Sequence, residues 1–195
     1  MTLSPEMTEF CDAWIRKAEL HNGTELPDYY NRAFTLFTTY NRLYAEATFT
    51  LARERKIRLP PDRFPDAKGA KKYAPQFIGY QALLNELQND PDCSRSVQEL
   101  IHLLETEVFH IKLSMPHGRP RRDKDLELLA GLKSADTETK ISALMDIVYS
   151  VRCNMFHGNK RFDPVQVRLL EPVITILRKI TDVLYDKLKT YQETA

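Results

Sequence analysis

The sequence predicts an all-α protein, a helical bundle of about five to seven helices interrupted by two irregular basic loops. Apolar residues recur at three- and four-residue steps along nearly the whole chain, which is the period of an amphipathic helix. No segment shows the alternation of apolar and polar residues, flanked by hairpin turns, that indicates a β-strand. With 195 residues, 43% of them hydrophobic, the chain is expected to form a single domain over residues 1–195.

The N-terminal part contains two predicted helices. Ser4, Pro5 and Glu6 have the order of an N-cap, a first-turn proline and an acid near the positive end of the helix dipole. A much longer helix opens at Leu26 and carries an aromatic stripe. The stripe consists of Tyr30, Phe34, Phe37, Tyr40, Tyr44, Ala47 and Leu51. Such stripes belong to the core in most proteins, and a platform that stacks nucleobases is the alternative.

Two breaks in the helical pattern are rich in cations. Residues 57–75 contain four prolines and one glycine, which exclude a regular helix. Between Arg53 and Lys72 there are eight Lys or Arg residues against three acids. The second break, 113–125, holds Arg119, Arg121, Arg122 and Lys124. Each break is either a solvated loop or a surface that contacts the phosphates of a nucleic acid.

Two helices are expected between the breaks. A short one is predicted from the apolar residues Phe77, Ile78, Leu83, Leu84 and Leu87. Ser94 is expected to cap the second, whose apolar residues run from Val97 to Ile111.

After the second break, a short helix at 126–132 is expected to precede a longer one capped by Asp136. The longer helix carries apolar residues from Ile141 to Met155. Asp163 opens the last helical region, in which Pro172 either kinks the helix or marks the start of its main part.

Composition excludes several classes of protein. The net charge of +1 lacks the global positive charge of many strong nucleic-acid binders, so any such binding must use local patches. Three scattered cysteines and the absence of a signal peptide predict a reducing, cytoplasmic location. No run approaches 18 apolar residues, so no membrane span is expected.

No metal site and no cofactor are predicted. His102, Glu105, Glu107 and His110 share one stretch, but their spacing places them on different helix faces. No zinc-type cluster, P-loop, nucleophile elbow or dinucleotide-binding glycine motif is present.

The stretch VRCNMFHGNK, residues 151–160, places chemically active residues at a helix end. Arg152 lies between Val148 and Met155 on the buried or interface-facing side of the helix, where an arginine needs an anionic partner. His157 is about 140° round the helix from Arg152, and Gly158 is the expected helix stop. The two side chains can therefore converge only if the helix end distorts or a second copy of the segment faces the first. A purely structural alternative pairs Arg152 with an acid such as Glu46 and leaves His157 to cap carbonyls.

The longer stretch VYSVRCNMFHGNK resembles the signature of the HEPN superfamily: an arginine, four to six residues, then a histidine near the end of a core helix. The resemblance covers about residues 28–190 and is strongest at 141–160. It implies a homodimer in which two copies of the motif meet at a two-fold axis and cleave RNA without a metal. Arg152 and His157 would be catalytic, and Asn154 would replace the polar residue that often directly follows the arginine.

A histidine and an arginine suit this chemistry, because imidazole can move the 2′-hydroxyl proton and guanidinium can bind the phosphorane oxygens. Lys160, Arg119, Arg121 and Arg122 are the predicted substrate-binding residues. The resemblance implies a toxin or a defence-system ribonuclease, with a possible antitoxin protein as a partner. Lys160 stands where the subgroup paired with nucleotidyltransferase antitoxins carries a tyrosine. The alternative function is a catalytically silent HEPN bundle that serves dimerisation or RNA binding.

Overall fold

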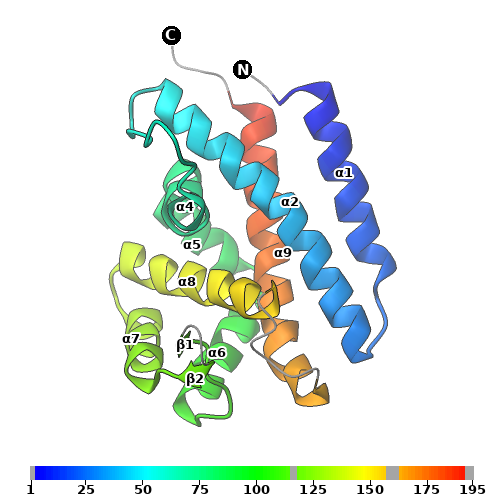
Figure 1. Cartoon of the computed structure of the whole chain (residues 1–195), viewed down its shortest axis with the longest axis vertical. Coiled ribbons are helices and arrows are strands. Elements are labelled where there is room, and N and C mark those ends of the chain that lie inside the picture. The colour runs from blue at the N-terminus through cyan, green and yellow to red at the C-terminus, as the bar shows by residue number, and fades with distance from the viewer. Residues whose placement is uncertain (1–2, 115–117, 157–162, 192–195) are drawn as a thin grey trace.

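The computed structural model describes residues 3–114, 118–156 and 163–191, and these residues form an all-α bundle with one two-stranded ribbon (Figure 1). Seven of the described helices have ten residues or more, which agrees with the expected five to seven. The helices are α1 (Pro5–Leu20), α2 (Leu26–Arg53), α3 (Asp66–Lys68), α4 (Ala74–Ile78), α5 (Tyr80–Asn89), α6 (Pro91–Glu105), α7 (Arg122–Lys133), α8 (Thr137–Phe156) and α9 (Val167–Thr190). The strands are β1 (Leu113–Ser114) and β2 (Arg119–Pro120), paired antiparallel.

The bundle is organised around α2 and α9, which pack along each other. Figure 1 shows α1 on the outer side of α2, with α8 running across the long helices instead of along them. α6 packs on α9, and α7 packs on α8. The core between these layers is mostly aliphatic, with Leu43, Ile176 and Ile180 buried completely, and it includes aromatic residues of α2. The end of α8 therefore meets α2 at the surface of the bundle.

Helix starts follow the expected physical chemistry. The Ser4 hydroxyl accepts a hydrogen bond from the Met7 amide at 3.2 Å, which satisfies one free N–H of α1. Asp136 does the same for α8 by accepting from the Thr139 amide at 2.8 Å. Both caps were predicted, because a short polar side chain before an apolar helical repeat indicates a start.

The cap of α6 was assigned to the wrong residue. Asp90 is the N-cap and accepts from the Asp92 and Cys93 amides, at 3.1 and 3.0 Å, whereas Ser94 lies inside the helix. Pro91 follows Asp90 as a first-turn proline, which is the stronger start signal.

The end of α6 also differs from the prediction, which continued the helix to Ile111. The helix stops at Glu105, and Glu107 has a left-handed backbone conformation with φ of 55°. The apolar period from Val97 to Ile111 is therefore only partly helical. From Thr106 onward the chain leaves the helical path and reaches α8, where the Ile111 carbonyl accepts a hydrogen bond from Asn154.

The insert, residues 57–75, is not a loop throughout. From Asp66 the chain is helical, as α3, a π-helical turn at Gly69–Tyr73 and α4. The prediction that prolines and a glycine exclude a regular helix holds for residues 57–65 and is wrong from Asp66 onward, where the backbone widens to a π turn at Gly69 and remains helical. Gly79, with φ of 95°, then separates α4 from α5, so the single short helix expected there is two.

Near the C-terminus, α9 begins at Val167 and continues through Pro172. Of the two alternatives, Pro172 as the start of the main helix is therefore wrong. Asp163 caps a preceding 3-10 turn, Pro164–Gln166, by accepting from the Val165 amide at 2.9 Å. The second break is similarly shorter than expected, because α7 already starts at Arg122.

The aromatic stripe of α2 divides into two parts. Phe37, Tyr40 and Tyr44 are buried, which confirms the prediction of a core role for them. Phe34 is 48% exposed and stacks on Phe156, which is 47% exposed, with ring centres 5.1 Å apart. For Phe34 the core prediction is wrong, since its ring lies against the exposed ring of Phe156 at the surface.

Candidate functional site

The predicted motif lies at the C-terminal end of α8, which ends at Phe156. Val148 and Val151 are buried in the core, and the Arg152 side chain beside them keeps 21% of its surface exposed. Arg152 is thus at the boundary between core and solvent, the position from which a guanidinium can still reach a ligand. His157 and Lys160, the other predicted residues of this stretch, lie outside the described residues.

The Arg152 guanidinium is held by a carboxylate and two rings. Its Nη1 lies 3.3 Å from Oδ2 of Asp66, and its central carbon lies 5.4 Å from the ring centres of Tyr149 and of Phe156. A planar cation is stabilised by both kinds of contact. Its Nε is buried and has no hydrogen-bond partner among the described residues. Its contacts with Asp66 and the two rings therefore fix the orientation of the side chain.

Asp66 is the hub of this arrangement. Its carboxylate accepts hydrogen bonds from the hydroxyls of Tyr149, at 2.8 Å, and Tyr44, in addition to the Arg152 ion pair. Burial acts to raise the pKa of Asp66, but these two hydrogen bonds and the charge of Arg152 outweigh it and lower the pKa. Burial and the hydrogen bond to Asp66 raise the pKa values of both tyrosines. The cluster holds one carboxylate, one guanidinium and two neutral phenols at neutral pH.

Close packing of the insert against α2 places Asp66 beside Tyr44 and Arg152. A Cβ on Gly69 would lie 3.0 Å from the Tyr44 ring, 3.2 Å from the Phe64 ring and 3.2 Å from the Thr48 hydroxyl. Only glycine leaves room for the π-helical turn to approach α2 this closely. The carboxylate of Asp66, three residues earlier, then meets the hydroxyl that Tyr44 extends from α2.

The structural alternative for Arg152 named the wrong partner. Glu46 lies 3.3 Å from Arg53 on its own helix, and the insert supplies the carboxylate for Arg152 instead. Nothing in the pattern of the insert indicated Asp66. Tyr149 could have been found, because it stands three residues before Arg152 and therefore shares its helix face.

A second charged cluster lies six residues before Arg152 on α8, around Asp146. Asp146 binds Lys71 of the insert at 2.8 Å and Lys112, which precedes β1, at 2.7 Å. Lys112 also donates to the Ser150 hydroxyl at 2.9 Å. Burial would raise the pKa of Asp146, but the two lysines outweigh it and lower the pKa. Lys71 of the insert and Lys112, just before the second break, thus both contact α8 and share one carboxylate.

Asn154, the third predicted catalytic residue, is buried and donates to the Ile111 carbonyl at 2.9 Å. Its amide nitrogen therefore binds the backbone of the segment between α6 and β1. In this position it fastens that segment to the end of α8.

The predicted substrate-binding arginines of the second break differ in their surroundings. Arg119 is exposed, and Arg121 is exposed beside Asp123 at 3.7 Å. Arg122 is half-buried: it donates to the Leu104 carbonyl at 2.7 Å and pairs with Glu107 at 3.1 Å. Arg119 and Arg121 are accessible to a phosphate, whereas Arg122 donates a hydrogen bond to a backbone carbonyl in the last turn of α6.

The part of the chain that the structure describes contains no group of three or more His, Cys, Asp or Glu side chains that could hold a metal ion. Of the two acids in the stretch from His102 to His110, Glu105 pairs with Lys133 and Glu107 pairs with Arg122. None of the helices within residues 3–114, 118–156 and 163–191 is long and apolar enough to cross a membrane.

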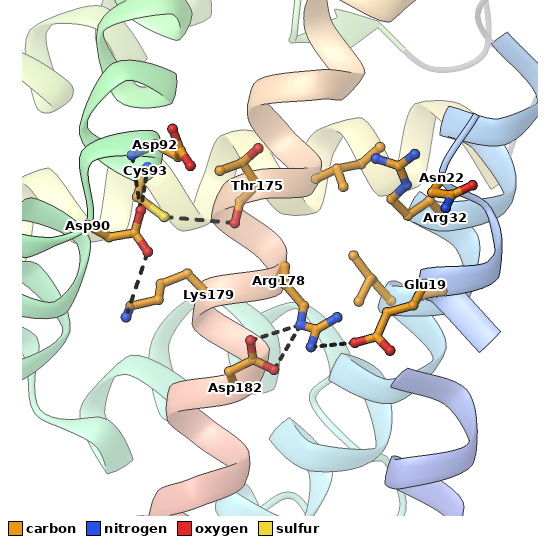
Figure 2. A pocket seen from close by; sticks show the side chains of 13 residues that line it. Glu19, Asn22, Arg32, Asp90, Asp92, Cys93, Thr175, Arg178, Lys179 and Asp182 are labelled. Atoms are coloured by element: carbon orange, nitrogen blue, oxygen red, sulfur yellow. Dashed lines mark hydrogen bonds and ion pairs between the residues drawn. The ribbon is translucent and has the colours of Figure 1, made fainter. Parts of the chain in front are cut away.

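A concave pocket lies elsewhere, between α1, α2, α9 and the start of α6 (Figure 2). Its volume is about 440 Å³, and its charged residues mostly neutralise one another. Figure 2 shows Arg178 between Asp182 and Glu19, with nitrogen–oxygen distances of 2.8 and 3.1 Å. Cys93 at its edge is no ready nucleophile, because burial raises the pKa of its thiol to about 12.

Comparison with known proteins found no match among protein-family models, curated proteins or solved structures. A functional proposal must therefore be based on the geometry at the end of α8 and on the resemblance of its sequence to the HEPN motif.

Proposed function

We propose that this protein is a metal-independent endoribonuclease of the HEPN type, of the kind that acts as a toxin or in defence. The observation that carries the proposal is the state of Arg152. A guanidinium fixed by Asp66 and two aromatic rings, with 21% of its side chain still exposed, stands five residues before His157. A pre-oriented cation of this kind can stabilise the charge that develops on a phosphorane without reorganising first.

In the proposed reaction, the ribose 2′-hydroxyl attacks the adjacent phosphorus and displaces the 5′-oxygen. Arg152 binds the non-bridging oxygens, and His157 transfers protons. The network of Asp66, Tyr44 and Tyr149 holds the guanidinium in one orientation. The products are a 2′,3′-cyclic phosphate, or the phosphate formed by its hydrolysis, and a free 5′-hydroxyl.

Cleavage of single-stranded RNA by the purified protein in EDTA tests this proposal. Arg152→Ala and His157→Ala should each abolish cleavage, whereas Arg95→Ala, which removes a surface cation paired with Asp92, should not. Circular dichroism must show that the Arg152 variant keeps its helices, because Arg152 also pairs with Asp66. A substrate with one 2′-deoxy sugar at the cleaved position should resist; cutting there at a comparable rate rules the mechanism out.

The composite site requires a homodimer, and the stacked pair Phe34 and Phe156 supports one. Two large exposed rings lie directly beside Arg152, where the second copy of the motif is expected. Phe34→Asp should shift the sedimentation of the protein toward the monomer and reduce cleavage. Leu20→Asp, at an exposed apolar residue at the end of α1, is the matched control. A wild-type monomer at tens of micromolar would contradict the composite site.

The second candidate is a catalytically silent dimerisation or RNA-binding module. It is favoured by the Arg152–Asp66 ion pair, since this pair gives the arginine a structural role of its own. In that case the wild-type protein binds RNA without cutting it. Replacing Arg119 and Arg121 with Ala should then weaken binding and reduce its salt dependence, because two phosphate contacts are lost.

A further inference from the structure

Asp146 of α8 holds two lysines that come from separate parts of the chain. Its Oδ1 lies 2.8 Å from Nζ of Lys71 in the π-helical turn, and its Oδ2 lies 2.7 Å from Nζ of Lys112, just before β1. All three side chains are partly exposed, Lys71 by 34% and Lys112 by 23%. Two ammonium groups are therefore fixed on one carboxylate at the surface of α8.

This cluster has two positive charges against one negative charge. Each ammonium group is held within hydrogen-bonding distance of the same small carboxylate, so the two lysines are close enough to repel each other. Burial acts to raise the pKa of Asp146, but its hydrogen bonds and ion pairs with both lysines outweigh burial and lower the pKa. The carboxylate is thus ionised at neutral pH, and a positive charge is still left over. A second anion beside the two lysines would relieve their repulsion.

The cluster also has hydrogen-bond donors suited to such an anion. An ammonium group has three N–H donors. Within the described residues, Lys71 donates to Asp146, and Lys112 donates to Asp146 and to the Ser150 hydroxyl at 2.9 Å. Because the Ser150 oxygen accepts from Lys112, its own proton can be donated elsewhere. Several donors and a surplus positive charge match a phosphate group, which has several strongly accepting, negatively charged oxygens.

The ring of Tyr149 connects this cluster to Arg152. The Lys71 Nζ lies 5.7 Å from the centre of the ring, and the central carbon of the Arg152 guanidinium lies 5.4 Å from the same centre. The Tyr149 hydroxyl also donates to Asp66, the carboxylate that pairs with Arg152. Lys71 and Arg152 are thus neighbours across one side chain, and a chain of phosphates that reaches one of them can also reach the other.

We propose that Lys71, Lys112 and Ser150 form a phosphate-binding site on α8. The two lysines bind the phosphate oxygens as charged donors, and Ser150 donates to one of them. Asp146 is a positioning residue that holds the two ammonium groups together. The site needs neither RNA cleavage nor any residue after Phe156, so it goes beyond the proposed ribonuclease activity. Its ligand is a phosphate group, in an RNA backbone or in a free phosphate compound.

Binding of a 2′-O-methyl RNA oligonucleotide tests the site, because this probe has no free 2′-hydroxyl and is not cut by the proposed reaction. Replacing Lys71 and Lys112 together with Ala should weaken binding by about tenfold or more, since hydrogen bonds to a charged group are lost. The slope of the logarithm of affinity against that of salt concentration should decrease by about 0.7, the effect of one phosphate contact with a single strand. Circular dichroism verifies that the double variant is folded.

Lys179→Ala is the matched control for these measurements. Lys179 is 27% exposed and pairs with Glu86 and Asp90, so its removal takes away a comparable ion-paired lysine from another face of the bundle. Neither the affinity nor the salt slope should change in this variant.

Nuclear magnetic resonance of ¹³C-labelled lysines identifies the source of the phosphate. A shift of the Lys71 and Lys112 Cε signals with the oligonucleotide assigns the site to an RNA backbone, and a shift with inorganic phosphate alone assigns it to a free phosphate compound. Signals that respond to neither probe would overturn the inference, as would a folded double variant that binds both probes as tightly as the wild type. A wild type that binds RNA without cutting it would end the proposed ribonuclease activity and leave this site intact.

Discussion

The insert, residues 57–75, and the second break, residues 113–125, have similar composition but are anchored to the bundle in different ways. The insert docks through apolar packing: Gly69, Ala70 and Ala74 are buried against α2 and its neighbours. The second break docks through a buried charge, since Asp125 binds two backbone amides. Proline and basic residues alone therefore do not distinguish a solvated loop from a segment that positions functional groups.

Each segment brings a carboxylate to one basic side chain. The insert brings Asp66 to Arg152, and the second break brings Asp125 to His110. The difference lies in exposure: half of the Asp66 side chain still reaches solvent, whereas Asp125 is fully buried. The second anchor should accordingly be the more sensitive to substitution.

The largest expected effect is that of Asp125→Ala. It leaves the buried amides of Ile111 and Lys112 without an acceptor, which should cost about 3 kcal/mol of unfolding free energy. Urea denaturation measures the loss. Asp123→Ala, two residues earlier in the same turn and exposed, should change stability by less than about 0.5 kcal/mol. Equal effects of the two would show that Asp125 is not the anchor.

Gly69→Val should destabilise the protein by about 2 kcal/mol, because its side chain must enter the space between Tyr44 and Phe64. The insert would move away from α2, and the tyrosine fluorescence of the native state should change with it. Lys68→Val places the same side chain on the exposed side of the turn and is the control. A stable Gly69→Val protein with unchanged fluorescence would mean that the insert does not depend on close packing.

The contribution of Asp66 should depend on pH. Its pKa is lowered on folding from an ordinary value of 3.8, so its stabilising effect is complete above that value and is lost as pH falls through the folded pKa. Asp66→Asn should therefore be less stable than wild type at pH 7, by about 1 kcal/mol, and the difference should shrink in strongly acidic solution. Denaturation curves of both proteins across this range provide the measurement, and a constant difference would contradict it.

The smallest effects are expected at Asp146, which pairs with Lys71 of the insert and with Lys112, just before the second break. Lys71→Ala and Lys112→Ala should each cost about 0.5 kcal/mol, because both ion pairs are partly exposed. The double variant should differ from the sum of the single ones, since each lysine alters the charge environment of the other. Strict additivity in a double-mutant cycle would show that the two segments contact α8 independently.

Much of the fold was predictable from local signals. The helical period, the Ser4 cap, the Asp136 cap and the buried residues Phe37, Tyr40 and Tyr44 all follow from side chains within a few positions of one another. The sequence-based prediction of helix ends was wrong where two local signals pointed to different residues. Asp90 with Pro91 displaced Ser94 as the cap of α6, and the left-handed Glu107 ended that helix despite an apolar repeat that continued past it.

The amino-acid sequence by itself determined the all-α class and the placement of Arg152 at the edge of a helix face near its end, because helix formation and amphipathic burial depend on nearby residues. Only the tertiary structure decided the partners of that arginine. Asp66 is 86 residues away along the chain, and Asp125 meets His110 across a helix end that no periodicity predicts. Contacts of this kind depend on how closely two backbone segments can approach each other. At Gly69 the absence of a Cβ allows the insert to lie close to α2.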